Sequence, residues 1–137
     1  ETRLVRHNIL NPETAEHARF HVVPAAVFAD PQVASVGATE RGLRQARRKH
    51  VVGTRRYADT AYGWALEATT GFVKVLADPD TRLVLGAHIF GPQASTLIQP
   101  LIQAMCLGTT IDQLAHDVLY IHPALTEVVE NALLQIT

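Results

Sequence analysis

The sequence predicts an α+β fold, an antiparallel β-sheet with helices packed on one face, and two observations lead to this class. The clearest hairpin joins strands at 71–77 and 82–90 through the turn Asp78-Pro79-Asp80-Thr81, and both arms are rich in β-branched and apolar residues. The most apolar helical segments, 94–107 and the stretch from Leu125, follow the strands in the chain. Strands first and helices last are typical of a sheet covered from one side.

Before the hairpin, we expect a helix tail, several short strands and one helix. Residues 2–10 have a helical pattern that Asn11-Pro12 ends, and 11–19 form a linker. A helix extends from the N-cap Thr39 to about Lys49, and 59–70 are irregular. The expected strands are 20–23, 26–29, 33–37 and 51–58.

After the hairpin, the pattern is helical. Residues 94–107 are predicted as one helix that Pro100 kinks and Gly108 ends. Thr110 opens a further helix in which Gln113 takes the reciprocal capping position. The final helix is expected to bury Leu125, Val128, Val129, Ala132, Leu133 and Ile136.

Length and composition exclude several classes of function. The chain has 137 residues and a formal net charge of −1, which suits one domain with no general attraction to nucleic acid or to an anionic membrane. Its apolar runs are too short to span a bilayer, and no signal peptide is visible, so we expect a cytoplasmic protein. The single Cys106 excludes an internal disulfide, a CxxC redox pair and a zinc thiolate cluster.

The segment from His122-Pro123 to Glu127 carries the candidate chemistry. Pro123 biases His122 toward extended backbone and suits a helix start, so the imidazole is presented just ahead of the final helix. Glu127 falls in or near the first turn, where the helix dipole favours a carboxylate. A carboxylate on one ring nitrogen fixes the tautomer and raises the basicity of the other. A His-Pro pair ahead of a helix more often marks only the start of that helix. Glu130, one turn further along, is an alternative partner for His122.

Other candidate ligands have simpler interpretations. His88 is expected to have a structural, cross-strand role. His17 and His21 have helix-like spacing, but no carboxylate or cysteine joins them, so no metal site is expected. The basic run from Arg41 to Arg48 is interpreted as a solvated helix face. Cys106 is expected to be a small buried hydrophobe.

The apolar stripes of 94–107 and 125–136 exceed what a small sheet needs to cover. A symmetric interface is the natural use of such a surplus. The candidate interface residues are Leu97, Ile98, Leu101, Leu125, Val129 and Leu133.

Three sets of motifs, in their order along the chain, resemble one known family. Residues 23–40 (VPAAVFADPQVASVGATE), the pair 71–75 and 85–92, and the ending from His122 to Glu127 resemble the C-terminal dimerisation domain of the flavin-dependent pyridine nucleotide–disulfide oxidoreductases. The resemblance covers about 20–137, which we take as the dimerisation domain. Residues 1–19 then resemble the last helix of a preceding FAD-binding domain and its linker.

The resemblance implies a role that neither composition nor spacing establishes. Such enzymes pass electrons from NADPH or NADH through FAD to a cysteine pair and then to a disulfide substrate. His122 would be the acid/base, held by Glu127, and would act in the partner subunit of a homodimer. The backbone of His122 and Pro123 would approach the partner's FAD. This chain, which begins at Glu1 without an initiator Met, would be an excised fragment that binds no cofactor and is inactive alone.

Within the family, residues 61–67, 98–105 and the ending from His122 are most similar to the mycothione reductase branch, whose substrate is the disulfide of a low-molecular-weight thiol. Ala124 stands where many relatives carry Thr. The alternatives are the same domain of a dihydrolipoamide dehydrogenase, a mercuric reductase or a soluble transhydrogenase, or a free-standing, non-catalytic dimerisation module. A mercuric reductase would carry a cysteine pair near its C-terminus, which this chain lacks.

Overall fold

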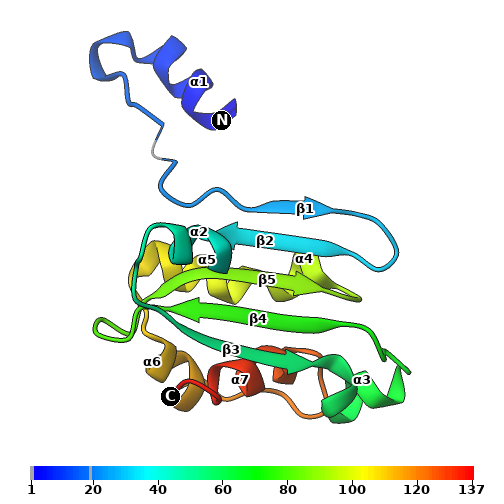
Figure 1. Ribbon diagram of the computed structural model, residues 1–137. Coiled ribbons are helices and arrows are strands. Elements are labelled where there is room, and N and C mark those ends of the chain that lie inside the picture. Colours follow the sequence, from blue (N-terminus) through cyan, green and yellow to red (C-terminus); the bar gives the residue numbers. More distant parts are fainter. Residues whose placement is uncertain (1, 19) are drawn as a thin grey trace.

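One antiparallel sheet of five strands organises the chain, and its strand order is β1-β2-β5-β4-β3 (Figure 1). The computed structural model describes residues 2–18 and 20–137. The strands are β1 Ala25–Val27, β2 Val33–Gly37, β3 Val51–Arg56, β4 Phe72–Ala77 and β5 Val84–Phe90. The predicted α+β class is confirmed.

The β4–β5 hairpin forms the centre of the sheet, as the sequence predicted. The two strands pair from Phe72 opposite Phe90 to Ala77 opposite Val84. The turn is held by the Asp78 carboxylate, which accepts hydrogen bonds of 3.0 Å from two backbone N–H groups, those of Asp80 and Thr81. Aspartate favours turns because its side chain can bond the backbone two or three residues ahead.

The predicted helix at 94–107 is two helices, α4 Ala94–Leu97 and α5 Gln99–Leu107. Pro100 lies in the first turn of α5, where its missing N–H costs nothing, and its ring excludes a continuous helix through the preceding turn. Gly108 ends α5 in the left-handed conformation, with φ 71°.

The last two helices match their predicted positions with small changes. Helix α6, Ile111–His116, begins with the predicted capping box between Thr110 and Gln113. Helix α7, Thr126–Leu133, begins three residues after Pro123, so this proline precedes the helix and is not its first residue.

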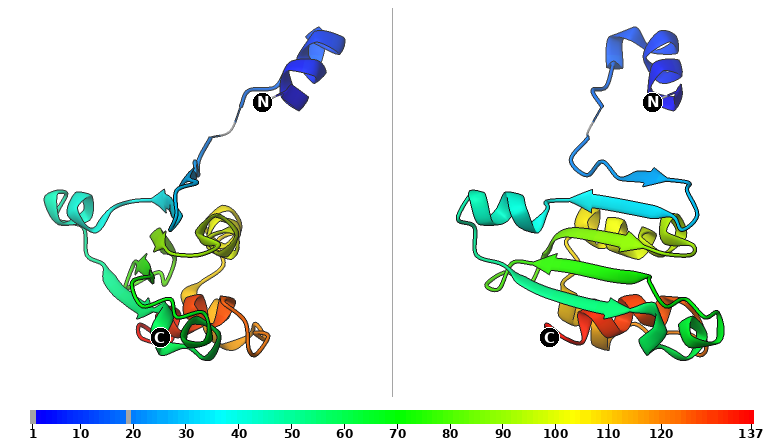
Figure 2. Two further views of the ribbon diagram at one scale, coloured as in Figure 1. Left: turned by 90° about the vertical axis from the view of Figure 1, so that its right-hand side faces the viewer. Right: turned by 45° about the vertical axis from the view of Figure 1, so that its right-hand side comes forward.

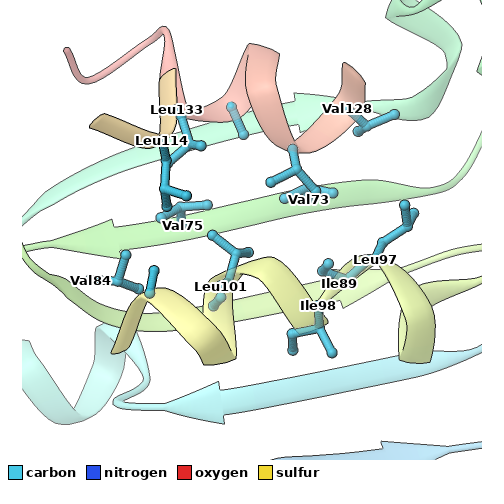
Figure 3. Packing of buried hydrophobic residues seen from close by; sticks show 14 of the residues in the cluster. Val73, Val75, Val84, Ile89, Leu97, Ile98, Leu101, Leu114, Val128 and Leu133 are labelled. Carbon is cyan, nitrogen blue, oxygen red and sulfur yellow. The ribbon is translucent and has the colours of Figure 1, made fainter. Parts of the chain in front are cut away.

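The helices α4 to α7 cover one face of the sheet, and their apolar side chains meet those of β4 and β5 (Figure 3). Val73 and Val75 of β4 and Ile89 of β5 are at most 1% exposed. Burying a side chain of this size stabilises the fold by about 1.5–3 kcal/mol. This layer, packed from strands and late helices, is the main core.

Helix α2, Glu40–Gln45, lies on the opposite side of the sheet from α5 (Figure 2, left view). The sequence predicted helices on one face only, and it predicted this helix to continue to Lys49. Thr39 caps it as expected, with Oγ1 accepting a hydrogen bond of 3.1 Å from the Gly42 N–H. Arg47, which has a positive φ of 52°, follows its last turn.

Four further elements complete the chain: α1 Thr2–Leu10, η1 Pro12–Thr14, η2 Tyr57–Asp59 and α3 Ala61–Ala65. Helix α1 matches its prediction and stands away from the sheet (Figure 1). Helix α3 lies in a stretch predicted as irregular, because five residues are too few to show a helical period. The segment 20–23 is not a strand, since the pairing of β1 with β2 begins only at Ala25.

Helix α7 approaches β3 so closely that only glycine fits between them. A Cβ placed on Gly53 would lie 2.0 Å from the backbone oxygen of Ala132. We predict that Gly53→Ala lowers the free energy of unfolding by about 1–3 kcal/mol, because α7 must move outward. Urea denaturation of the chain measures this, with the exposed neighbour change Thr54→Ala as control. Equal stability of Gly53→Ala and the native chain would contradict this packing.

Candidate active site

The segment 117–125 connects α6 to α7 and carries His122 on the surface of the domain. The His122 side chain is 69% exposed, whereas that of Glu127 is only 14% exposed. The His122–Pro123 peptide bond is cis. Glu127 stands in the first turn of α7, as predicted, and the imidazole lies within its reach.

His122 and Glu127 form a direct hydrogen bond, with 2.7 Å between Nδ1 and Oε1. A carboxylate can only accept, so Nδ1 carries the proton and the neutral ring has its lone pair on Nε2. Nε2 has no hydrogen-bond partner among residues 2–18 and 20–137. The arrangement therefore presents a basic nitrogen, of fixed tautomer, to the outside of the domain.

The carboxylate of Glu127 is itself held in place. Its second oxygen, Oε2, accepts a hydrogen bond of 3.1 Å from the Ala124 N–H. The side chain of Asn131 donates one of 2.7 Å to the Glu127 backbone oxygen, one turn further along α7. Neither contact can be predicted from the sequence, because both involve backbone groups whose position depends on the turn before α7.

The charge of Glu127 is stabilised by its neighbours. The hydrogen bond from His122 lowers the pKa of this carboxyl group below its ordinary value of 4.5. Burial opposes this effect in part, and the hydrogen bond from the Ala124 N–H adds a lesser lowering. Glu127 is thus ionised at neutral pH and can stabilise a proton on the imidazole.

Glu130, the alternative partner, is not the residue bonded to His122. Its charge instead acts on Tyr120, whose pKa is raised to about 12, first by burial and then by Glu130. The Tyr120 hydroxyl donates a hydrogen bond of 3.2 Å to the Leu114 backbone oxygen. This contact ties the segment that precedes His122 to the end of α6.

The six residues predicted to contact a partner subunit lie inside the chain's own core, so that prediction is corrected. Their exposed fractions are at most 4%. The inward sides of α4, α5 and α7 pack on the sheet of the same chain. The six residues are Leu97, Ile98, Leu101, Leu125, Val129 and Leu133.

Exposed apolar side chains are found instead around the segment before His122. Leu119 is 97% exposed and Ile121 is 76% exposed. Both line a groove of about 470 Å³, together with Pro100, Ala104 and Tyr120, and no charged residue takes part in the lining. Sequence periodicity could not identify these residues, since they belong to a loop.

His88 has the structural role expected of it, with Nε2 3.1 Å from the Ala38 backbone oxygen. Cys106 is exposed on α5 and not buried, because Leu101 and Ala104 take the inward face of that helix. Within the described residues, no three potential ligands gather in a way that could hold a metal ion.

Comparison with known families matches residues 23–133 to the model described as "Pyridine nucleotide-disulphide oxidoreductase, dimerisation domain". The chain belongs to this family. Its sheet and helices are the family's dimerisation domain, and His122 lies in that domain's final segment. Helix α1 precedes the matched range.

The curated relatives are longer than this chain. The chain is 49% identical to mycothione reductase of Mycobacterium tuberculosis over 98% of its length, which covers 30% of that relative. It is 41% identical to dihydrolipoyl dehydrogenase of Haloferax volcanii over 81% of the chain and 24% of the relative. The chain thus spans about a third or less of the curated relatives it matches.

Two solved structures share the fold of this chain. LpdA from Mycobacterium tuberculosis superposes with a TM-score of 0.85 at 25% identity, over 97% of this chain and 29% of that one. The Cu(II) complex of the flavoprotein disulfide reductase RclA from Escherichia coli has a TM-score of 0.86 at 24% identity, over 98% and 30%. No helix in the described part of the chain has the length and apolarity needed to cross a membrane.

The hydrogen bond between His122 and Glu127 predicts how the Glu127 carboxyl group titrates. In His122→Ala, the pKa of Glu127 should rise toward 4.5, because the largest cause of its lowering is removed. A lowered pKa in the folded state contributes stability above about pH 4.5 that is lost as the pH falls through the folded value. The native chain should therefore exceed His122→Ala in stability at pH 6 and lose this advantage toward pH 3.

Carbon-13 NMR of the carboxyl groups measures this titration. Asp112 is the internal control, since its pKa is lowered chiefly by Arg82 and should not change. An unchanged Glu127 pKa in His122→Ala would mean that the hydrogen bond does not form in solution.

Proposed function

We propose that this chain is the C-terminal part of an FAD-dependent, NADPH-using disulfide reductase and lends His122 to the active site of a partner subunit. The observation that carries the proposal is the His122–Glu127 hydrogen bond of 2.7 Å on a family dimerisation domain. The His122 side chain is 69% exposed, and Nε2 has no hydrogen-bond partner in the described part of the chain. A partner surface is where such a base has a use.

The proposed chemistry is proton transfer during thiol–disulfide exchange. His122 Nε2 takes the proton from a cysteine thiol of the partner subunit, and the thiolate attacks one sulfur of the substrate disulfide. The substrate S–S bond breaks as the new S–S bond forms. The imidazolium then gives its proton to the departing thiolate, so one thiol leaves and His122 is again neutral. The second cysteine of the pair attacks the mixed disulfide, which releases the other substrate thiol and leaves the cysteine pair as a disulfide. Glu127 stabilises the imidazolium through Nδ1–H in the interval.

The segment at His122 and Pro123 can contact one edge of a flavin, but it cannot form a complete flavin-binding site. His122 is mostly exposed, and the described chain offers an edge with no phosphate-binding loop. In this proposal the backbone of His122 and Pro123 lies against the partner's FAD. FAD, when bound, supplies the electrons that return the partner's cysteine pair to its dithiol form.

The proposed substrate is a low-molecular-weight disulfide, as for mycothione reductase, which the chain matches at 49% identity over almost its full length. The second candidate is lipoamide, supported by identities of 41% and less to dihydrolipoyl dehydrogenases. Specific reduction of lipoamide, without reduction of mycothione, would favour the second candidate. We also propose that 1–19 belong to the preceding FAD-binding domain, because Val5, Ile9 and Leu10 of α1 are exposed and uncovered.

A second copy of the chain is the proposed occupant of the groove beside the loop. In a twofold interface, one patch must contain both a projection and a recess that accepts it. Leu119 and Ile121 are the projecting side chains, and the recess is lined by Pro100, Ala104 and Tyr120. The patch is continuous with His122, so docking there brings the imidazole to the partner.

The acid/base role is tested in the complete flavoenzyme that contains this chain. His122→Ala should slow disulfide reduction by about 10² to 10⁴, because general acid–base help of that size is lost. Reduction of the flavin by NADPH should stay within about twofold of native. Stopped-flow absorbance separates the two half-reactions. Glu127→Gln should lower the disulfide half-reaction by a smaller factor, and equal loss of both half-reactions would exclude the proposed role.

The dimer surface is tested by charge insertion. Leu119→Asp or Ile121→Asp should weaken self-association by at least about tenfold, because a carboxylate buried in an uncharged groove loses its hydration. Sedimentation velocity over a concentration series gives the dissociation constant. Phe28→Asp is the matched control, since Phe28 is 78% exposed and lies at the distant β1–β2 connection. A stronger effect of the control than of both groove variants would place the interface elsewhere.

A further inference from the structure

A cavity of about 530 Å³ lies on the face of the sheet opposite the core helices, between α2 and the central strands. This volume falls within the usual range for small-molecule sites, about 300–1,000 Å³. Its lining includes Glu40, Arg41 and Arg44 of α2, Phe72 and Lys74 of β4, and His88 of β5.

The strand register sets the floor of the cavity. Lys74 pairs with His88, and Phe72 pairs with Phe90, so these side chains alternate with the core residues and point to the other face. The rings of Phe72 and Phe90 lie 6.1 Å apart between centroids. The floor is thus aromatic at one end and cationic at Lys74.

Two glycines bring α2 over this floor. Gly37 ends β2 with φ +72°, and a Cβ on Gly86 would lie 2.1 Å from the Ala38 backbone oxygen. The chain can therefore cross β5 at close range, and His88 is held to that same oxygen. Thr39 then caps α2, whose first turn projects Glu40 and Arg41.

The charges around the cavity do not cancel. Glu40 forms ion pairs with both Lys74 and Arg44. The pKa of Glu40 is lowered, chiefly by the hydrogen bond from Lys74, so this carboxyl group stays charged. Arg41 is a third cation in the lining, and the formal charge of the lining is +2. The Arg44 side chain remains 73% exposed and can bond a ligand.

We infer that this cavity binds a small aromatic molecule bearing a phosphate group. Arginine guanidinium groups recognise phosphate through paired hydrogen bonds, and Arg41 and Arg44 lie three residues apart on one helix face. The half-buried ring of Phe72 provides the surface for a flat ring. The inference concerns the face opposite the core helices and does not depend on the proposed function.

Phenyl phosphate and inorganic phosphate are the probes, titrated into the 137-residue chain by calorimetry and by ¹H–¹⁵N NMR. Phenyl phosphate should bind saturably and at least about fivefold tighter than inorganic phosphate. The amide shifts should be largest in α2 and at Lys74 and His88. Binding without saturation, or with the largest shifts outside these elements, would overturn the inference.

Single substitutions distinguish binding of phenyl phosphate at this site from its general attraction to basic residues. Arg41→Gln and Arg44→Gln should each weaken phenyl phosphate at least about tenfold, and Arg41→Gln breaks no ion pair seen in the described chain. Arg47→Gln is the matched control, from the same basic segment but outside the lining, and should stay within about twofold. Equal loss in Arg47→Gln would overturn the inference.

Phe72→Leu tests the aromatic part of the site. It should remove the preference for phenyl phosphate over inorganic phosphate while leaving the affinity for inorganic phosphate nearly unchanged. Thermal unfolding of each variant, compared with the native chain, shows that it is folded before titration. A preference that survives Phe72→Leu in a folded chain would contradict the proposed role of this ring.

Discussion

The packing of α7 against β3 and β4 is the constraint on which the rest of the structure depends. Val128, Val129 and Leu133 close the core from one side, and Gly53 lets the helix backbone approach the sheet. The same helix carries Glu127 in its first turn. Any displacement of α7 would therefore move the carboxylate that holds His122. Stability of the core and geometry of the site are coupled through one element.

Local rules predicted a large part of this fold from the sequence. The β4–β5 hairpin, the capping box of Thr110 and the stop at Gly108 each depend on chemistry within a few residues, and each is present. The pairing of His122 with Glu127 is of the same kind, since a first-turn carboxylate lies close to the segment that precedes the helix.

The errors arose where a residue's role depends on distant packing. Apolar periodicity identified Leu97, Leu101 and Leu133 as a contact stripe, but periodicity cannot distinguish a face toward the sheet from a face toward another subunit. Cys106 was placed on the wrong side of α5 for the same reason. The face of the sheet that α2 covers depends on Gly37 and Gly86, which allow the backbone to cross β5 at close range. This close approach can be recognised only once the pairing of the strands is known.

The two faces of the sheet have opposite chemistry, and this explains how a nearly neutral chain can offer two different surfaces. On the helical side, the loop at Leu119 and Ile121 exposes apolar groups beside an uncharged groove, which suits a copy of the same chain, since like charges would otherwise meet at the twofold axis. On the other side, cations exceed carboxylates around the cavity under α2. The formal net charge of −1 does not reveal this local excess of cations, because acidic residues elsewhere in the chain offset them. The sign of the local lining, and not the net charge, therefore determines which ligands each face can attract.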